Sequence, residues 1–255
     1  MNKSIYILIC SVLTFFTTNA QLDPVSYHDG NSKLNGWAAI PEKKLTENPG
    51  VLVLHAWKGI DNHAKDSALK LWALGYHVFI ADIYGEGNYP NNTKEAGQRA
   101  GYYKKNPLQY QNRIRKALEQ LQKAGANPDK IVIIGYCFGG TGAIEAARGQ
   151  LPIEGVVSFH GGLAKIDERK TTVINTKILV CHGADDKNES PEKISAFHDE
   201  MRSANADWQM IYYANAVHSF TDPAAGNDNS KGNAYNEKAA KRSWEHLMDF
   251  LKEVL

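Results

Sequence analysis

The sequence has almost no excess of charge of either sign. Its 255 residues include 29 lysines and arginines against 28 aspartates and glutamates, so the net charge is only +1. It also lacks a basic stretch interleaved with aromatic residues, the pattern that many proteins use to follow a nucleic acid backbone. These absences argue against nucleic acid as a partner.

Long apolar runs are scarce as well. The run at residues 5–16 covers about a dozen residues, whereas a helix needs roughly twenty to span a bilayer. Lys3 is the only charged residue among the first twenty, and the small residues Thr18 and Ala20 stand where a signal peptidase would bind. We therefore predict a signal peptide at residues 1–20, cleaved after Ala20. The mature protein should be exported to the periplasm or secreted, with no membrane anchor.

After this segment, short apolar runs alternate with longer amphipathic segments. Most of the apolar runs lack polar and apolar alternation, as expected of strands that are buried on both faces. Alternating strands and helices predict an α/β architecture, with a mostly parallel central sheet flanked by helices. The predicted strands are Val51 to Ala56, Tyr76 to Ala81, Ile131 to Tyr136, Gly155 to His160, Lys177 to His182 and Trp208 to Tyr213. The predicted helices are Asp61 to Leu74, Pro107 to Ala124, Thr141 to Arg148, Pro191 to Asn205 and Ala234 to Val254.

Two shorter segments precede this alternation. Val25 to His28 and Asn35 to Ile40 are separated by a stretch that contains Asp-Gly-Asn-Ser at positions 29–32, a composition that favours a turn. We predict an antiparallel hairpin at the edge of the sheet. Removing 20 of the 255 residues leaves 235, a length that fits one domain with a single core, so residues 21–255 are predicted to form a single domain.

The strongest functional pattern is the sequence GYCFGG at residues 135–140, between a predicted strand and a predicted helix. It has the form of a nucleophile elbow, a sharp turn that lifts one side chain above the sheet, with Cys137 in the place usually taken by serine. The glycines two before and two after the cysteine relieve the crowding of such a turn. The helix that follows directs its free N–H groups toward the sulfur, which favours the thiolate. Cys137 is therefore predicted to be a nucleophile rather than a buried structural cysteine.

Candidates for a base and an acid follow later in the chain. Asp185 and Asp186 come after the strand Lys177 to His182, and His218 comes after the last predicted strand. The order nucleophile, acid, base is that of α/β hydrolases, and all three lie beyond the carboxyl ends of strands, where sites gather in open α/β sheets. We predict that His218 takes the proton of Cys137 and later returns it to the leaving group, while an aspartate orients the imidazole. This pattern leaves Asp185 and Asp186 both open.

An acyl-transfer step also needs hydrogen-bond donors for its oxyanion. The N–H of Phe138, the residue after the nucleophile, is one candidate. The second is the backbone N–H of Trp57, in the loop after the first core strand. Three further histidines at strand ends on the same side are expected to line the site at most; they are His55, His160 and His182.

Other roles for Cys137 fit less well. Once Cys10 has left with the signal peptide, Cys137 and Cys181 remain in an oxidising compartment, where a disulfide could form. However, a third strand should separate theirs, which places them about 10 Å apart, whereas a disulfide needs Cα atoms within about 7 Å. We therefore predict two free thiols. A metal site is disfavoured because no ligand pair has the short spacing of zinc motifs, and a non-enzymatic binding protein on the same fold stays as the alternative to an enzyme.

These motifs resemble those of the dienelactone hydrolase family of α/β hydrolases. The resemblance covers residues 51–255 and rests on the elbow at 135–140, on HGADD at 182–186, on HSF at 218–220 and on ADIYG at 81–85. It implies the α/β-hydrolase fold, a Cys-His-Asp triad, no metal or organic cofactor, and hydrolysis of small esters or lactones. The family pattern Gly-x-x-Asp after the strand indicates Asp186 as the acid.

The sequence departs from the family at one position. The founding enzyme of the family has a glutamate next to its oxyanion loop, and Ala56 takes the matching place here. That enzyme also holds a substrate carboxylate with an arginine, a role for which Arg99 is the candidate in this chain. We therefore expect an exported hydrolase of small carboxylic esters or lactones, with its physiological substrate and oligomeric state left open.

Overall fold

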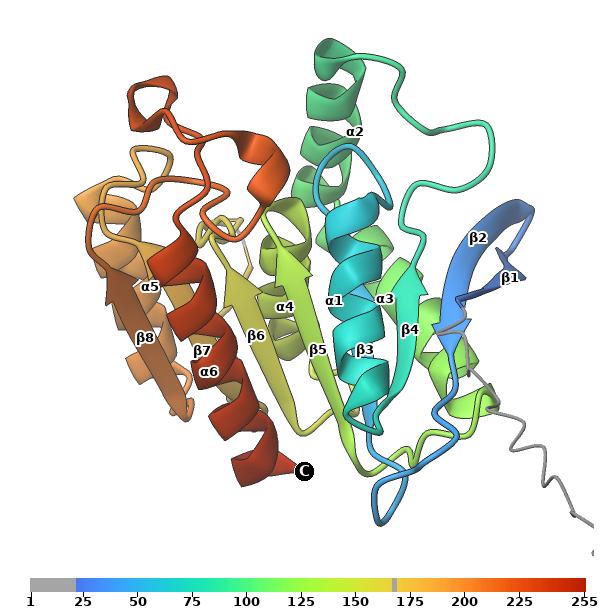
Figure 1. Ribbon diagram of the computed structural model, residues 1–255. Helices are drawn as coiled ribbons and strands as arrows, with labels where there is room; N and C mark the ends of the chain where they lie inside the picture. Colours follow the sequence, from blue (N-terminus) through green and yellow to red (C-terminus); the bar gives the residue numbers. More distant parts are fainter. Residues whose placement is uncertain (1–21, 167–168) are drawn as a thin grey trace, which may run out of the picture.

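A twisted sheet of eight strands runs through the protein (Figure 1). The computed structural model describes residues 22–166 and 169–255. The strand order is β1-β2-β4-β3-β5-β6-β7-β8, in which the pairs β1–β2 and β2–β4 are antiparallel and the other five are parallel. The strands are β1 (Asp23–Asp29), β2 (Ser32–Ala39), β3 (Gly50–Leu54), β4 (His77–Ala81), β5 (Ile131–Tyr136), β6 (Gly155–Phe159), β7 (Lys177–Gly183) and β8 (Trp208–Tyr213).

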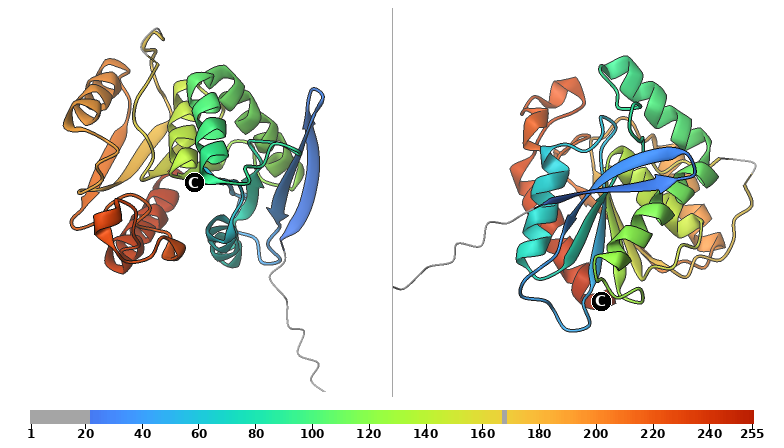
Figure 2. Two further views of the ribbon diagram at one scale, coloured as in Figure 1. Left: turned by 90° about the horizontal axis from the view of Figure 1, so that it is seen from above. Right: turned by 90° about the vertical axis from the view of Figure 1, so that its right-hand side faces the viewer.

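Helices cover both faces of the sheet (Figure 2). Apolar side chains of α1 and α6 pack on one face, and those of α3, α4 and α5 pack on the other, so the protein has two cores separated by the sheet. The helix α2 packs against α3 rather than directly on the sheet. The helices are α1 (Asn62–Ala73), α2 (Thr93–Lys105), α3 (Pro107–Lys123), α4 (Phe138–Arg148), α5 (Pro191–Ser203) and α6 (Glu237–Val254).

The central strands are buried on both faces. Every residue of β3, β4, β5 and β6 is buried. Along β3, Leu52 and Leu54 join the core beneath α3 and α4, while Val51 and Val53 join the core beneath α1 and α6. Because successive side chains point to opposite faces and both faces are apolar, the sequence shows no alternation here.

The predicted architecture is confirmed. Each of the six predicted core strands and five predicted helices is present, and the N-terminal segments pair as an antiparallel hairpin at one edge of the sheet. Several boundaries differ: β3 ends at Leu54 instead of Ala56, α4 begins at Phe138 instead of Thr141, and α6 begins at Glu237 instead of Ala234. The helix α2 was not predicted.

The two cysteines of the described chain lie on β7 and just beyond β5, with β6 between these strands. In the parallel register, Phe159 of β6 is the partner of Tyr136 on one side and of Cys181 on the other. Cys137 and Cys181 are both free thiols, which confirms that prediction.

No helix of the described residues has the length and apolar character needed to cross a membrane. The predicted signal peptide at residues 1–20 lies outside the part of the chain that the structure describes.

Candidate active site

Cys137 stands at a tight turn between β5 and α4. Its backbone has a φ of 54° and a ψ of −110°, a conformation that few residues other than glycine adopt. A Cβ atom on Gly135 would lie 2.0 Å from the carbonyl oxygen of Gly139, and one on Gly139 would lie 2.2 Å from that of Leu54. The two glycines are thus required because the first turn of α4 folds back onto β5 and packs on the end of β3. This is the geometry predicted for the elbow.

Three residues that are distant in sequence meet at this turn. The Nε2 atom of His218 lies 3.0 Å from the sulfur of Cys137, and its Nδ1 atom lies 2.8 Å from Oδ2 of Asp186. Asp186 follows β7, and His218 lies in the loop after β8. Both nitrogens of one imidazole are therefore engaged, one by a thiol and the other by a carboxylate.

The electrostatics of this group favour a charged pair. Burial opposes ionisation of the Cys137 thiol, but the hydrogen bond and the charge of His218 outweigh it, so the pKa of Cys137 lies below its ordinary value. Burial likewise opposes a charge on His218, but its bonds to Asp186 and Cys137 outweigh burial and raise its pKa. The pKa of Asp186 is lowered because, against burial, its carboxylate accepts from His218 and from the N–H of Asn188. The shifts at Cys137 and His218 both favour a thiolate beside an imidazolium.

The structure distinguishes the two adjacent aspartates. Asp186 is 5% exposed and reaches His218, whereas Asp185 is exposed to solvent. The N–H of Asp185 donates to the carbonyl of Ala216 at 3.0 Å, which holds this turn against the loop after β8. The structure thus brings Asp186, and not Asp185, to the imidazole.

The two predicted oxyanion donors lie around the elbow. Burial raises the pKa of Cys137, and His218 makes the largest contribution to lowering it. The N–H of Phe138 is close enough to the Cys137 sulfur to make a smaller contribution in the same direction. Trp57 follows β3 and its carbonyl accepts a hydrogen bond of 2.7 Å from the Tyr84 hydroxyl, which fixes the loop. Among the described residues the N–H of Trp57 has no hydrogen-bond acceptor, so it is free to bind a substrate oxygen.

Arg99 lies on an exposed part of α2. Its guanidinium forms no ion pair or hydrogen bond with any described residue, although its charge acts on Tyr84 beside the elbow. The structure therefore does not bring Arg99 into contact with Cys137.

Sequence reasoning missed Lys104, one turn farther along α2. Its charge lowers the pKa of Cys137, although this effect is smaller than that of burial, which raises the pKa, and smaller than that of His218, which lowers it. The side chains of Lys104 and Glu189 both lie beside Gly162. Nζ of Lys104 is 3.6 Å, and Oε1 of Glu189 is 3.7 Å, from the place that a Cβ atom on Gly162 would take. Burial raises the pKa of Glu189. Because α2 was not predicted, no signal placed Lys104 near the sulfur.

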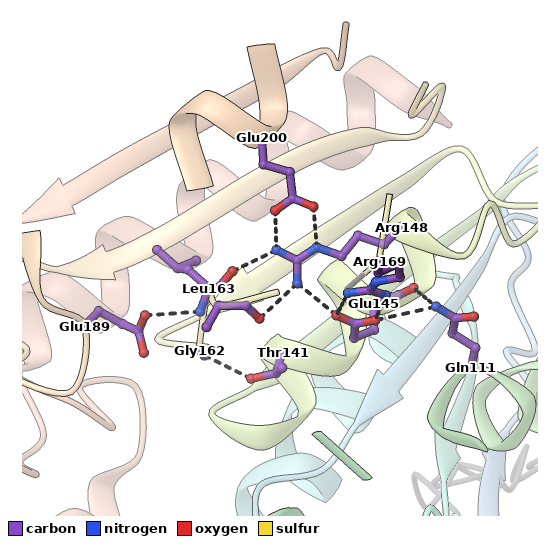
Figure 3. A network of polar contacts seen from close by, with 10 residues as sticks. Gln111, Thr141, Glu145, Arg148, Gly162, Leu163, Arg169, Glu189 and Glu200 are labelled. Atoms are coloured by element: carbon purple, nitrogen blue, oxygen red, sulfur yellow. Dashed lines mark hydrogen bonds and ion pairs between the residues drawn. The ribbon is translucent and has the colours of Figure 1, made fainter. Parts of the chain in front are cut away.

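The loop after β6 is fastened beside the site by a buried network of charges (Figure 3). The guanidinium of Arg148, on α4, donates two bonds of 3.0 and 2.6 Å to Glu200 of α5 and one of 2.8 Å to Glu145. It also donates to the carbonyls of Leu163 and Ala164 in the loop. The same loop is held from the other side, where the N–H groups of residues 162 and 163 donate to the side chains of Thr141 and Glu189.

No group of three or more His, Cys, Asp or Glu side chains in the described chain is arranged to hold a metal ion. Of the three histidines expected to line the site, His55 packs beneath the elbow with its ring 5.9 Å from that of Phe138. His182 lies near Asp186 and His218, whose charges act on it in opposite directions. His160 packs edge-on against His218.

Comparison with known proteins identifies the chain's relatives. The model of the dienelactone hydrolase family matches residues 34–255. The crystal structure of P91, a dienelactone hydrolase-like promiscuous phosphotriesterase from metagenomic libraries, superimposes with a TM-score of 0.85 at 34% identity, over 92% of this chain and 98% of that one. A putative carboxymethylenebutenolidase of Aquifex aeolicus is 24% identical over 91% of this chain and 98% of its own length.

A third relative is named a probable 2-oxo-3-(5-oxofuran-2-ylidene)propanoate lactonase. This protein, from Bradyrhizobium, is 24% identical over 80% of this chain and 83% of its own length. All three relatives are named as enzymes, which decides between an enzyme and a binding protein in favour of an enzyme. The chain belongs to the dienelactone hydrolase family and is a carboxylic ester hydrolase.

Proposed function

We propose that this protein is an exported hydrolase of small carboxylic esters or lactones that works through Cys137, His218 and Asp186 and a thioester acyl-enzyme. The observation that carries the proposal is the imidazole of His218, which lies 3.0 Å from the Cys137 sulfur and 2.8 Å from the Asp186 carboxylate. A nucleophile, a base and an orienting acid within hydrogen-bond reach of one another are the requirement for covalent catalysis of acyl transfer.

The reaction proceeds in two steps. The thiolate of Cys137 attacks the carbonyl carbon of the substrate, and the tetrahedral intermediate expels the alkoxide, which takes the proton of the His218 imidazolium. A thioester on Cys137 results. His218, now neutral, removes a proton from a water molecule that attacks the thioester, and the second tetrahedral intermediate expels the Cys137 thiolate as the carboxylic acid leaves, which restores the thiolate and the imidazolium. With a lactone, the alkoxide stays attached to the acyl group, and one hydroxy acid is released.

The oxyanion of each tetrahedral intermediate is bound by the N–H groups of Phe138 and Trp57. The free N–H of Trp57 and the position of Phe138 at the first turn of α4 support this assignment. Losing one donor of this kind costs about 3 kcal/mol of transition-state stabilisation.

The signal peptide predicted at residues 1–20 supports the export part of the proposal. The substrate is then an ester or lactone met outside the cytoplasm. Ala56 leaves no carboxylate beside the oxyanion loop, so the substrate range is proposed to differ from that of the founding enzyme.

The proposal is tested with the purified mature protein and a panel of substrates. p-Nitrophenyl acetate and dihydrocoumarin represent esters and lactones, and paraoxon is included because P91 is described as a phosphotriesterase. Asp186→Asn is expected to lower kcat for the ester by about 10²- to 10⁴-fold, since the imidazole loses its tautomer and its charge partner. The matched control Asp185→Asn changes an exposed carboxylate one residue away and should stay within about twofold of the wild type. Equal effects of the two substitutions would contradict the role of Asp186.

The pH dependence of kcat/KM follows from the charged pair. The thiolate is present above the lowered pKa of Cys137, and the imidazolium is present below the raised pKa of His218. Activity should therefore rise at a pH below the ordinary thiol value of about 8.5 and fall only at a pH above the ordinary histidine value of about 6.5. Rates of p-nitrophenyl acetate cleavage across the pH range measure both limits. An activity that rises only near the ordinary thiol pKa would mean that the pair does not form.

A further inference from the structure

The loop that carries His218 is folded around the side chain of His160. The imidazole of His160 contacts the rings of His218 and Phe220 edge-on, each with a centroid separation of 5.2 Å. Its Nε2 atom lies 2.8 Å from the hydroxyl of Thr221. Three residues of this loop, His218, Phe220 and Thr221, thus contact the side chain of His160. Between them Ser219 has a φ of 60°, so the loop takes an unusual backbone turn to do so.

His160 also connects this loop to the nucleophile. It follows β6 directly, and the carbonyl of the preceding Phe159 accepts the N–H of Cys137 at 3.0 Å. The N–H of His160 itself donates to the carbonyl of Cys181 on the neighbouring strand. The ring therefore projects from a backbone position fixed to both the elbow and the sheet.

A second histidine reaches the same hydroxyl from outside. His63, near the start of α1, places its Nε2 atom 3.1 Å from Oγ1 of Thr221, and its ring packs 4.3 Å from that of Tyr136. A hydroxyl has one hydrogen to donate and lone pairs to accept, so it satisfies both contacts when one imidazole offers an N–H and the other a bare nitrogen. His63, Thr221 and His160 form a hydrogen-bonded chain from a helix on the sheet face to the loop of His218.

The surroundings of His160 and His63 favour the uncharged form of both imidazoles, because the pKa of each is lowered. Burial lowers the pKa of His160, and the nearby His218, His63 and His182 lower it further. Burial also lowers the pKa of His63, against the attraction of nearby carboxylates. The charged groups that act on His63 are Asp61, Asp66, Lys70 and Asp222.

A histidine at position 160 lowers the stability of the fold. It is 2% exposed, its Nδ1 atom has no hydrogen-bond partner among the described residues, and its φ of 40° lies in the left-handed region. An unpaired buried nitrogen and an unusual backbone conformation both cost stability, and such costs concentrate where they serve function. An apolar ring would avoid the first of them, so packing alone does not account for a histidine here.

We propose that His160 is a positioning residue for His218: the Thr221 hydroxyl, anchored by His63, holds the His160 ring against the His218 imidazole and keeps that imidazole aligned with the Cys137 sulfur. This inference rests on the proposed function, because it assigns His218 as the partner of a nucleophilic Cys137. It adds three residues to the site, on α1, after β6 and in the loop after β8.

The test compares Thr221→Val, which keeps the shape but removes the hydroxyl, with Thr221→Ser, which keeps the hydroxyl. The readout is the rate of Cys137 alkylation by iodoacetamide as a function of pH, which needs no ester substrate and reports the fraction of thiolate. At a pH below the pKa of the Cys137 thiol, Cys137 in Thr221→Val should be alkylated about tenfold more slowly than in the wild type. The reason is that misalignment of His218 raises the thiol pKa by about one unit. Thr221→Ser should match the wild type.

Ester hydrolysis is measured in parallel. Thr221→Val should lower kcat for p-nitrophenyl acetate about tenfold, as expected for a change of one pKa unit, and leave KM within about twofold. If Thr221→Val does not fold, His63→Phe replaces it, since phenylalanine keeps the ring against Tyr136 and breaks only the outer link. An alkylation profile identical to that of the wild type, in Thr221→Val or in its replacement, would overturn the positioning role.

These outcomes separate this inference from the proposed function. If alkylation shifts as expected but no ester or lactone is cleaved, the positioning role holds and the substrate proposal fails. If esters are cleaved but the alkylation profile of the variant is unchanged, the proposed function holds and the positioning role fails.

Discussion

Replacing Cys137 by alanine is expected to lower kcat for ester cleavage on the order of 10⁶-fold, the scale at which removal of a covalent nucleophile acts in a triad. The reason is that the remaining groups have nothing to acylate: His218 could only activate a water molecule at a place shaped for a sulfur. The measurement is initial rates with p-nitrophenyl acetate, corrected for the uncatalysed reaction. Folding of the variant is verified by its thermal unfolding.

Cys181→Ala is the matched control for that result. Cys181 is fully buried in β7, and burial raises the pKa of its thiol to about 12, so it is not a thiolate at neutral pH. Its sulfur accepts a bond from the Tyr213 hydroxyl at 3.5 Å on the side of the sheet covered by α6. The control should keep its activity within about threefold and lose some stability from the removed sulfur. A Cys137→Ala protein that is as active as this control would mean that another group does the chemistry.

Arg148→Met is expected to lower the free energy of unfolding by about 3–5 kcal/mol, the cost of removing one partner of a buried ion pair. The side chains of Arg148, Glu145 and Glu200 are each less than a tenth exposed, so removing the guanidinium leaves two carboxylates without their main partner (Figure 3). Arg169 compensates in part, since it also pairs with Glu145. Because domains are stable by only about 5–15 kcal/mol, a loss of this size removes a large share of the total.

The control for this substitution is Arg202→Met. Arg202 pairs with Asp199 on the exposed side of α5, and the two side chains are 65% and 70% exposed. Exposed pairs of this kind contribute at most about 1 kcal/mol, so Arg202→Met should be close to the wild type. Urea unfolding of both variants measures the difference. Equal losses in the two variants would contradict the importance given to the buried network.

Much of the fold could be predicted because a strand that is buried on both faces of a sheet appears in the sequence as a continuous apolar run. The apolar run at residues 131–136 has the bounds of β5, in which every residue is buried. The helix α2 has no comparable apolar pattern in its sequence. Its sequence, TKEAGQRAGYYKK, contains two glycines, and of its residues only Ala96, Ala100 and Tyr103 are buried, too few to form an apolar stripe over 13 residues.

The site divides in the same way. The positions of Cys137, Asp186 and His218 could be anticipated because each follows a strand in a parallel sheet, and the carboxyl ends of those strands meet at one edge. The arrangement around them could not. Thr221 is 61 residues from His160 and 158 residues from His63, and no local pattern encodes contacts across such separations. The same holds for Lys104, whose place near the sulfur depends on the path of the loop between β4 and α2.

The most direct test of the central claim is the identity of the acylated atom. The protein is mixed with p-nitrophenyl acetate, quenched in acid during the first turnovers, and analysed by intact mass and peptide mapping. We predict one acetyl group, on the peptide that contains Cys137, removed by hydroxylamine as a thioester is, and absent from Cys137→Ala. Steady turnover with the acetyl group on another residue, or with no acylated protein in any quenched sample, would contradict the account.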